Sequence, residues 1–366
     1  MTTSDRRTFI KTLGAGGAAV ALAGCSDDEE IPDDGNGGNG GNGNGGNGDD
    51  QEEVDDYPPS SLDFINAYSE GGGVDTNMRQ IQPYFEEALG TNLSIDYRDG
   101  AGTRIAANTV AEDGELLRIG GTLSPATPAA VAFDEAEGED PDFTLDDLRP
   151  LGTLSGEAAI IRVRPDDDRF QTIEELVDYA DDNPGELTVG ASGPTNRNML
   201  SIIQLMEATG IDFTLVPFDG GGPTQTALLQ GEIDVAARSV YNSASIADES
   251  TCLCIYSEEN PEPDLTNDAP PINEALGTDI NYDPTNGTQF YYVSADAAEA
   301  HPSRYEHVQE AFYEAHQNEE YRADLDEIGE LGKLVWNDPD ETEEILRAAY
   351  ETYQEFIPLF QEYVQN

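Results

Sequence analysis

The sequence predicts an α/β fold of two lobes, each built on a mainly parallel, doubly wound sheet. Two features of the chain predict this class: short strand-like segments alternate with segments of helical periodicity, and the alternation occurs in two separate series. Composition is a third feature, since 37% hydrophobic residues, with 12 Phe and 16 Tyr, supply a sizeable core for 366 residues. One large or two ordinary domains are expected at this length.

The first series contains two strand–turn–helix units. Residues 62–68 (LDFINAY) alternate in polarity as a strand does, the turn 71–75 (GGGVD) follows, and apolar residues at helical spacing occupy 78–89. The unit then repeats, with a strand expected at 93–97 and a helix at 105–110. Strands that are joined by helices in this way pair in parallel, so these segments predict the sheet of the first lobe.

The second series begins with a strand at 159–163, after which Thr172 and Glu175 form a capping box that starts a helix. Further elements are expected, in order, as strand 187–190, helix 199–206, strand 212–216, helix 224–230 and strand 233–237. This alternation predicts a second parallel sheet and therefore a second lobe.

The C-terminal part is expected to return to the first lobe. Residues 287–293 (GTQFYYV) are strand-like, and the tail from Pro339 carries its apolar residues on one helical face, as a docked closing helix does. The predicted division is therefore first lobe 57–158, second lobe 159–286, and a first-lobe return with C-terminal helices at 287–366.

The N-terminal residues predict export and anchoring. Residues 1–24 combine Arg6 and Arg7 with a short apolar run, a pattern that resembles a twin-arginine signal and is too short to span a bilayer. The sequence Leu-Ala-Gly before Cys25 resembles a lipoprotein box, which predicts a lipid on the Cys25 thiol. Residues 25–56, rich in Gly, Asn and acidic residues, are expected to form a tether. The alternative is an ordinary cleaved signal with an incidental Cys.

The charge balance is strongly acidic, with 17 Lys and Arg against 75 Asp and Glu and a net charge of −58. Such a surface repels polyanions and therefore argues against nucleic acid as a partner. The scarcity of Lys, which occurs only at positions 11 and 333, predicts adaptation to concentrated salt. Self-repulsion is tolerable there because the Debye length is only about 3 Å at 1 M salt.

No pattern of a catalytic or metal site is present in the sequence. His301, His307 and His316 lie far along the chain from the glycine-rich turns, and we expect them to be solvated helix residues. Cys252 and Cys254 occupy a strand-like segment, which predicts two core thiols on one face; a two-Cys metal site without His is the weaker alternative. We therefore predict no enzyme activity, no cofactor and no metal.

Three glycine-containing turns, 71–75, 100–104 and 190–196, each fall between an expected strand and the start of a helix. Ligands bind at this position in open α/β sheets, because backbone N–H groups and the positive helix end favour an anion such as a carboxylate. The alternative is that each glycine serves the turn alone, and no turn completes a nucleotide-binding motif. Arg104, Arg197 and Arg238 are interpreted either as charges at the site or as surface ion pairs.

The candidate ligand-binding residues all lie in or beside these turns and the strands next to them. They are Gly71, Gly72, Gly73, Asp75, Gly100, Ala101, Gly102, Thr103, Arg104, Thr122, Ser124, Ser192, Gly193, Thr195, Asn196, Arg197, Gly220 and Arg238. We expect one carboxylate group of the ligand to bind the 71–75 and 100–104 turns, with the other end facing Ser192 to Asn196.

Several of these segments together resemble a known family. The turns EGGGVD (70–75) and GAGT (100–103), VPF at 216–218 and QGEID at 230–234 resemble, in order and spacing, the solute-binding receptors of tripartite tricarboxylate transporters, also called Bug receptors. The resemblance covers roughly residues 60–335. Departures concern the ligand more than the fold: Asp219, Thr195 and Met199 stand where the family has Lys, Gly and His, respectively.

The resemblance implies a two-lobed periplasmic-binding-protein type II fold that closes on a small carboxylate without a metal. The protein would then be a monomeric extracytoplasmic receptor, held to the outer face of the cytoplasmic membrane and presenting its ligand to membrane permease subunits. Two alternatives are a carboxylate-sensing receptor with a membrane signalling partner and an exported, lipid-tethered hydrolase.

Overall fold

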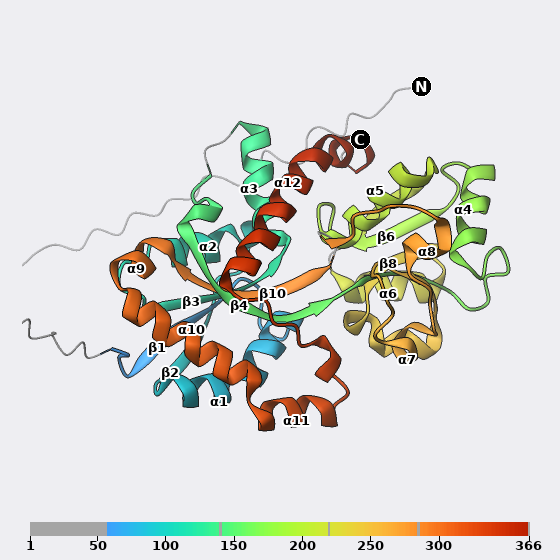
Figure 1. The fold of residues 1–366 in the computed structure, drawn as a ribbon. Coiled ribbons are helices and arrows are strands. Elements are labelled where there is room, and N and C mark those ends of the chain that lie inside the picture. The colour runs from blue at the N-terminus through green and yellow to red at the C-terminus, as the bar shows by residue number, and fades with distance from the viewer. Residues whose placement is uncertain (1–56, 139–140, 219, 284–285, 365–366) are drawn as a thin grey trace, which may run out of the picture. The chain divides into compact units, whose positions relative to one another are not determined.

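The computed structural model describes residues 57–138, 141–218, 220–283 and 286–364, all of which belong to one compact unit of the chain (Figure 1). The predictions for the signal, for Cys25 and for the tether fall on residues 1–56, which lie outside the described residues. No helix in the described ranges combines the length and the apolar character that crossing a bilayer requires.

The first lobe contains a five-stranded sheet with the strand order β2-β1-β3-β10-β4. Its strands are β1 (Ser61–Asn66), β2 (Asn92–Tyr97), β3 (Arg118–Ser124), β10 (Gly287–Ser294) and β4 (Leu148–Glu157). β1 pairs in parallel with β2 and β3, whereas β10 lies antiparallel to both β3 and β4. The strand predicted at 287–293 therefore joins the sheet of the first lobe, as expected.

The second lobe contains another five-stranded sheet, with the order β7-β6-β8-β5-β9. Its strands are β7 (Thr214–Phe218), β6 (Thr188–Ser192), β8 (Val235–Ser239), β5 (Ala159–Val163) and β9 (Thr251–Ile255). β6 is parallel to β7 and β8, and β5 is antiparallel to β8 and β9.

Both sheets are mixed, because one strand in each, β10 in the first lobe and β5 in the second, runs against the other four; the sheets are therefore mainly parallel in strand direction, as expected. Parallel pairing is confined to strands joined by helical crossovers, such as β1, β2 and β3 in the first lobe. β4 passes into β5 through Ala158 alone, and β10 returns from the second lobe to the first. β10 enters the first-lobe sheet, and β5 the second-lobe sheet, against the direction of the other strands, which is why each pairs antiparallel with both of its neighbours.

Helices cover the sheets of both lobes (Figure 1). In chain order they are α1 (Gly73–Leu89), α2 (Arg104–Ala111), α3 (Ala126–Glu137), α4 (Ile173–Asp182), α5 (Arg197–Thr209), α6 (Gly221–Gln230), α7 (Pro263–Thr266), α8 (Ile272–Leu276), α9 (Ala295–Ala300), α10 (Pro302–Gln317), α11 (Glu319–Glu327) and α12 (Pro339–Tyr363). The predicted helix at 78–89 is confirmed as part of α1, whose Met78, Ile81 and Phe85 are fully buried. The helix ends at Gly90, which has the left-handed backbone (φ 71°) typical of a C-cap.

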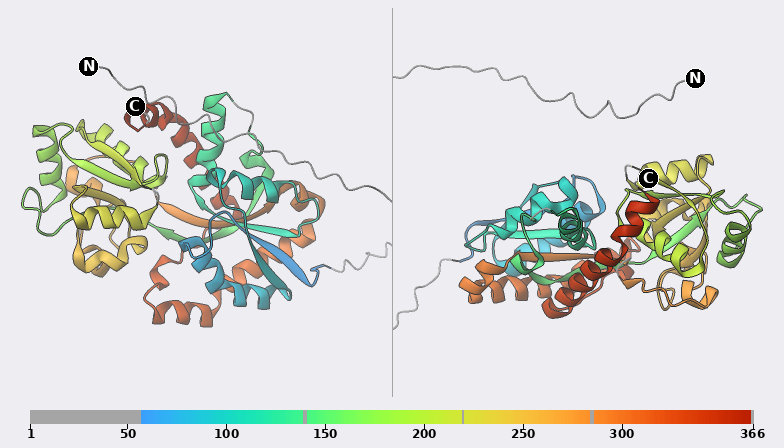
Figure 2. Two further views of the ribbon diagram at one scale, coloured as in Figure 1. Left: turned by 180° about the vertical axis from the view of Figure 1, so that it is seen from behind. Right: turned by 90° about the horizontal axis from the view of Figure 1, so that it is seen from above.

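The C-terminal helix α12 contacts both lobes, as the two views in Figure 2 allow the reader to follow. Asp338 is the N-cap residue of this helix, and its side chain forms a capping box with Glu341. Its buried face includes Tyr353, Ile357 and Phe360, which pack in one core cluster with residues of α3 and of the second lobe. The helix is therefore docked as predicted, and it closes the core of the second lobe as well as that of the first.

The two core cysteines are buried as predicted, but they do not share a face of β9. Cys252 is paired with Arg162 and Cys254 with Ile161, because a bulge shifts the register of β5 against β9 between these partners. Ile161 and Arg162 are adjacent in β5, so their side chains point to opposite faces of the sheet. The thiols of their partners Cys254 and Cys252 therefore point to opposite faces as well. Burial raises the pKa of the Cys252 thiol to about 12.

The prediction of three solvated histidines is wrong for His316, which is only 2% exposed in α10. Its Nε2 lies 3.2 Å from the carbonyl oxygen of Leu154, and its ring packs against Trp336. Burial lowers the pKa of His316 to about 4, so the side chain is neutral at pH 7. His301 and His307 are half-buried.

The capping box expected at the start of α4 is only half formed. The Thr172 side chain accepts a hydrogen bond from the Glu175 N–H, as predicted. The Glu175 carboxylate, however, accepts from the N–H of Gln171 rather than from that of Thr172. The start of the helix is nevertheless capped at the expected residue.

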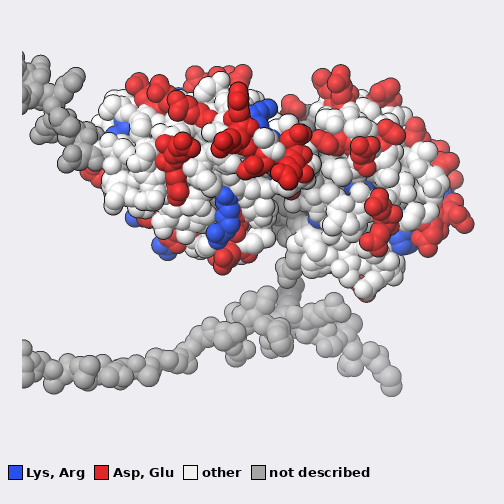
Figure 3. Space-filling view, turned by 90° about the horizontal axis from the view of Figure 1, so that it is seen from below, with Lys and Arg blue, Asp and Glu red and all other residues white. Residues whose placement is uncertain are grey.

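Acidic side chains dominate the face that Figure 3 shows, on which Asp and Glu cover far more surface than Lys and Arg. Few large apolar side chains are exposed, among them Ile105, Tyr313 and Ile328. The acidic excess of the sequence is thus a surface property, while the interior is built from ordinary hydrophobic clusters.

Candidate functional site

A cavity of about 770 Å³ lies between the two lobes, a volume within the usual range for small-molecule sites. The first lobe contributes the ends of β1 and β3, the turn at 100–104 and α3. The second lobe contributes the end of β6, the start of α5 and the end of β8, and α12 adds Tyr353. The carboxyl ends of the parallel strands therefore face the cavity, which is the position where open α/β sheets bind ligands.

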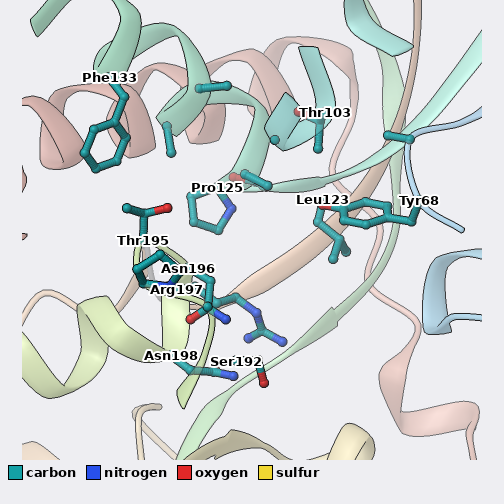
Figure 4. Close-up of a pocket in the computed structure, with 18 of the residues that line it drawn as sticks. Tyr68, Thr103, Leu123, Pro125, Phe133, Ser192, Thr195, Asn196, Arg197 and Asn198 are labelled. Carbon is teal, nitrogen blue, oxygen red and sulfur yellow. The ribbon is translucent and has the colours of Figure 1, made fainter. Parts of the chain in front are cut away.

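Many of the residues that the sequence predicts for the site line this cavity. They are Gly100, Gly102, Thr103, Arg104, Ser124, Ser192, Gly193, Thr195, Asn196, Arg197 and Arg238. Figure 4 shows Ser192, Asn196 and Arg197 from the second lobe across the cavity from Pro125 and Phe133 of the first. The 100–104 and 190–196 turns, far apart in the sequence, are thus brought together.

The 71–75 turn does not line this cavity, so the structure does not bring it together with the other two predicted turns. Gly72 and Gly73 line a separate cavity of about 330 Å³, while Gly71 and Asp75 line neither. The reason is local, because the Asp75 carboxylate folds back and accepts a hydrogen bond from the Gly71 N–H at 2.9 Å. The turn thus already holds an anion of its own at the start of α1.

Three further predicted residues also lie outside the cavity lining. Thr122 is fully buried, and its hydroxyl lies 3.1 Å from that of Thr127. Ala101 and Gly220 are exposed, each beside a residue that does line the cavity. Thr122 therefore supports the wall from behind, and the neighbour Gly221 takes the place expected of Gly220.

Arg238 is the most unusual charge at the site. Its side chain, at the end of β8, is 4% exposed and donates from Nη1 to the Ser192 hydroxyl at 2.9 Å and from Nη2 to the Asn242 carbonyl at 2.7 Å. Its Nε has no hydrogen-bond partner among the described residues, and Arg238 forms no ion pair with a described carboxylate. Burial lowers the pKa of Arg238 to about 10, so the guanidinium keeps its charge at pH 7.

The other two arginines at the cavity are neutralised by carboxylates. Arg197 at the start of α5 contacts Glu157 at 2.8 Å, and both side chains are largely buried. Arg104 contacts Asp134 of α3 at 2.5 Å and also donates to the Ala101 carbonyl. Arg104 and Arg197 therefore form ion pairs, but these pairs lie at the cavity and that of Arg197 is largely buried, so they are not the surface pairs of the alternative interpretation; Arg238 forms no such pair with a described carboxylate.

Gly221 and Gly287 allow the side chains of Arg238 and Arg197, respectively, to approach the backbone closely. A Cβ added to Gly221 would lie 2.5 Å from the Arg238 guanidinium, and one added to Gly287 would lie 2.3 Å from that of Arg197. Any other residue at these positions would displace the arginine side chain. Neither glycine was among the residues predicted for the site.

The 100–104 turn has a strained backbone. Gly100, Ala101, Gly102 and Thr103 all have positive φ angles, of 112°, 46°, 62° and 79°. Positive φ is uncommon for residues other than glycine, and it is found preferentially at functional sites. This conformation leads directly into α2 at Arg104, next to the cavity.

The sequence analysis missed the apolar part of the lining and several polar side chains. These residues are Ala67, Tyr68, Leu123, Pro125, Ala126, Ala129, Ala130, Phe133, Asn198, Ser239, Asn242 and Tyr353. A signal was available for α3, because residues 126, 129, 130 and 133 have the spacing of one helical face. No signal in the sequence places Tyr353, which lies more than 200 residues from that face, at the same cavity.

Three buried polar atoms of the lining residues lack hydrogen-bond partners in the described part of the chain. They are Arg238 Nε, the Tyr353 hydroxyl and Asn198 Oδ1. Unpaired buried polar groups are rare because each costs about 1–3 kcal/mol. These three atoms are candidate partners for a polar ligand, and other unpaired buried polar atoms, such as the Tyr292 hydroxyl, lie outside the cavity lining. No group of three or more His, Cys, Asp or Glu suited to a metal occurs among the described residues.

Comparisons with solved structures show the class of fold. A TctC solute-binding protein from Polaromonas, solved without ligand, superposes with a TM-score of 0.67 at 20% identity, covering 82% of this chain and 99% of that one. MatC from Rhodopseudomonas palustris with bound malate has a TM-score of 0.64 at 19% identity, covering 82% and 100%. A second Rhodopseudomonas palustris protein, with adipate, has a TM-score of 0.64 at 19% identity, covering 85% and 99%. The fold is therefore that of the two-lobed periplasmic binding proteins, type II.

Sequence comparisons show which family the chain resembles. Residues 77–251 match the model of the tripartite tricarboxylate transporter family receptor. A Pseudomonas protein (strain P51), the UPF0065 protein in the tcbD-tcbE intergenic region, is 26% identical over 238 residues, which are 62% of this chain and 66% of that relative. Over these residues the chain is similar to the tripartite tricarboxylate transporter receptor family, the family that its motifs resemble.

Proposed function

We propose that the protein is an extracytoplasmic solute-binding receptor that captures a small organic carboxylate between its lobes and presents it to the permease of a tripartite transporter. Arg238 carries the proposal, because it is a buried guanidinium without a carboxylate partner in the described residues and it lines the cavity between the lobes. Similarity to a receptor family supports it, as do the malate and adipate in two structural neighbours.

The physical argument starts from the desolvation of Arg238. A buried guanidinium loses its hydration, and an anionic ligand restores the lost interaction through charge-assisted hydrogen bonds. Its Nε has no partner of its own, while Ser192 and Asn242 hold the terminal nitrogens in place. The fork of a guanidinium matches the two oxygens of a carboxylate, so this geometry favours a carboxylate over a neutral sugar.

Further groups around the cavity suit the same ligand. The helix α5 starts at the cavity, where the Asn196 side chain accepts a hydrogen bond from the Met199 N–H. The positive end of the helix dipole therefore lies at the cavity, where it favours an anion. The hydroxyls of Ser192 and Thr195 are half-buried in the lining. These groups supply adaptable hydrogen bonds in addition to the single charge of Arg238.

The large negative charge of the protein is compatible with an anionic ligand when salt is concentrated. At about 1 M salt the Debye length is about 3 Å, so the surface carboxylates contribute little to the potential within the cavity. The adaptation to salt remains a proposal that rests on the net charge of −58. Circular dichroism during stepwise dilution of the salt tests it: loss of structure supports the proposal, and full cooperative stability in dilute buffer contradicts it.

The anchoring through Cys25 after twin-arginine export also remains a proposal, since it rests on the sequence alone. Cell fractionation of Cys25→Ser tests it. We expect the variant to leave the membrane fraction, and an unchanged membrane-bound fraction would contradict the anchor.

Calorimetric titration with organic acids in molar salt tests the binding function. We expect a carboxylate to bind the native protein and Arg238→Gln to lose that binding by more than about tenfold, since one charged partner of a buried pair is removed. Arg347→Gln is the matched control, because Arg347 is exposed and pairs with Asp146 and Glu343 outside the cavity lining. Binding of sugars or cations alone, or equal binding by Arg238→Gln, would contradict the proposal.

A further inference from the structure

We propose that the ligand is a monocarboxylate with an apolar body rather than a dicarboxylate. This inference rests on the proposed function and deepens it, because it names the class of carboxylate. Two independent features of the cavity carry it: the balance of charges in its lining, and the apolar face that α3 turns toward it.

The charge balance leaves one positive charge for the ligand. Among the described residues of the lining, Arg197 is paired with Glu157 and Arg104 with Asp134, so neither contributes a net charge. Arg238 alone is left without a carboxylate partner in the same set of residues. One guanidinium matches one carboxylate.

The remaining charges of the lining offer no partner for a second carboxylate. Asp99 and Glu137 are exposed acidic side chains at the first-lobe edge of the cavity. Neither forms an ion pair with a described basic residue. The far end of a dicarboxylate would therefore meet negative charge or apolar surface, and an unpaired charge in such a place is costly.

The neighbouring cavity of about 330 Å³ does not supply the missing positive charge. It shares Tyr68, Leu123 and Asn242 with the main cavity and contains Lys333. The ammonium group of Lys333 contacts Glu330 at 2.5 Å and donates to the side chains of Asn77 and Gln80 at 2.7 and 3.0 Å. All three of its donors are therefore engaged, and its charge is balanced.

The first-lobe side of the cavity carries an apolar stripe. Ala126, Ala129, Ala130 and Phe133 form a stripe along α3 that lines the cavity, and Leu123 and Pro125 continue it onto the end of β3. Phe133 is half-buried, with its ring 6.3 Å from that of Tyr353 and 5.8 Å from that of Phe360. An apolar wall favours a ligand with an apolar body, because contact between the two removes apolar surface from water. Figure 4 shows Phe133 and Pro125 facing the polar residues of the second lobe.

A matched pair of ligands tests the inference. Hexanoate and adipate have the same six-carbon chain and differ only in whether the far end is a methyl or a second carboxylate. Titration calorimetry in molar salt should show hexanoate binding more than about tenfold tighter than adipate. Benzoate and terephthalate form a second pair with a ring as the body, and benzoate should be the tighter.

The outcomes separate this inference from the proposed function. If adipate or terephthalate binds as tightly as its monocarboxylate partner, or more tightly, the inference is wrong while the carboxylate receptor stands. If no carboxylate of either kind binds, the proposed function itself fails and the inference fails with it.

Two variants make the test independent of the native affinity. Glu137→Arg places a positive charge at the exposed edge of the cavity, so adipate should gain about two- to fivefold relative to hexanoate through a direct ion pair. Glu87→Arg is its matched control, since Glu87 is exposed on α1 and the same charge change lies outside the cavity lining. An equal gain in both variants would mean that only the net charge matters, and it would overturn the inference.

Phe133→Ala tests the apolar wall. We expect hexanoate to lose about tenfold in affinity, because the body of the ligand loses its aromatic contact, while acetate, which has no such body, changes by less than about twofold. Equal losses for both acids, or none for hexanoate, would show that the stripe on α3 does not contact the ligand.

Discussion

The turns at 71–75 and 100–104 have the same sequence pattern but different roles in the structure. Both are rich in glycine and join a first-lobe strand to a helix, and both are expected to bind an anion. In the first turn the Asp75 carboxylate takes that place, accepting from Gly71 N–H and from the Tyr97 hydroxyl. The 100–104 turn leads into α2, which has no acidic residue in its first helical turn, and this loop lines the cavity. An acidic residue in the first turn of the following helix thus distinguishes a loop whose N–H groups already bind a carboxylate of the protein from a loop without such a carboxylate.

The largest effect on stability is expected for Asp75→Asn. The Asp75 carboxylate is buried and accepts hydrogen bonds from Gly71 N–H, Tyr97 and Arg79, so its loss should cost about 2–3 kcal/mol. Ligand affinity should stay within about twofold, because the turn lies outside the cavity lining. Urea unfolding at constant molar salt measures the first quantity and titration calorimetry the second. A large loss of affinity with unchanged stability would show that the two turns do not differ in role.

The pH dependence of this variant follows from the pKa of Asp75. Burial alone would raise that pKa, but the hydrogen bonds from Gly71, Tyr97 and Arg79 outweigh burial and hold it below the usual value of 3.8. A depressed pKa stabilises the folded state above the unfolded-state pKa, and this contribution is lost as the pH falls through the folded-state pKa. The stability difference between the native protein and Asp75→Asn should therefore be constant near neutral pH and shrink below about pH 4. A difference that grows on acidification would contradict this role of Asp75.

Gly102→Val tests the second turn, with a smaller effect on stability and a larger one on binding. Gly102 has φ +62°, which a valine adopts only with strain, so the variant should lose about 1–3 kcal/mol of stability. A Cβ there would lie 3.0 Å from Arg104 Nη1, and the valine side chain would disturb the cavity edge. Binding of any carboxylate should fall by more than about tenfold. Gly90→Val is the control, because Gly90 also has positive φ but lies outside the cavity lining.

The smallest effect is expected for Tyr353→Phe. The Tyr353 hydroxyl is buried without a partner in the described part of the protein, so its removal should leave stability unchanged or raise it by up to about 1 kcal/mol. Ligand affinity should fall by up to about tenfold if the ligand is the partner of this hydroxyl. A thermal-shift measurement with and without ligand separates the two effects. Marked destabilisation of the ligand-free protein would show that the hydroxyl has a structural partner instead.

The sequence predicts those helices and strands that bury one face in a core and expose the other to solvent. The helix α1 and the closing helix α12 were recognised because their apolar residues repeat at helical spacing and face one core. The strand β3 was missed, and the reason is packing: a Cβ on its Gly120 would lie 2.3 Å from the Tyr292 ring, so this strand carries glycine where an apolar residue would have revealed it. The helix α3 was missed because one side faces the cavity and another faces α12, which removes a simple alternation of polarity.

The candidate site could be predicted only as a set of turns. The positions of Gly100, Ser192 and Asn196 at the cavity follow from the topology of an α/β sheet, which sequence periodicity reveals. That Arg238 stands unpaired while Arg197 meets Glu157 depends on which side chains come together in three dimensions. No local pattern distinguishes these two arginines, because their partners are distant in the chain.

The identity of the molecule that the protein carries tests the central claim most directly. The protein would be purified in molar salt and denatured, and the released small molecules identified by mass spectrometry beside an identical preparation of Arg238→Gln. We predict an organic acid with a single carboxylate and an apolar body, present in the native preparation and depleted in Arg238→Gln. A sugar, a cation or an acid with two carboxylates as the released species, or the same acid in equal amount from Arg238→Gln, would contradict the account.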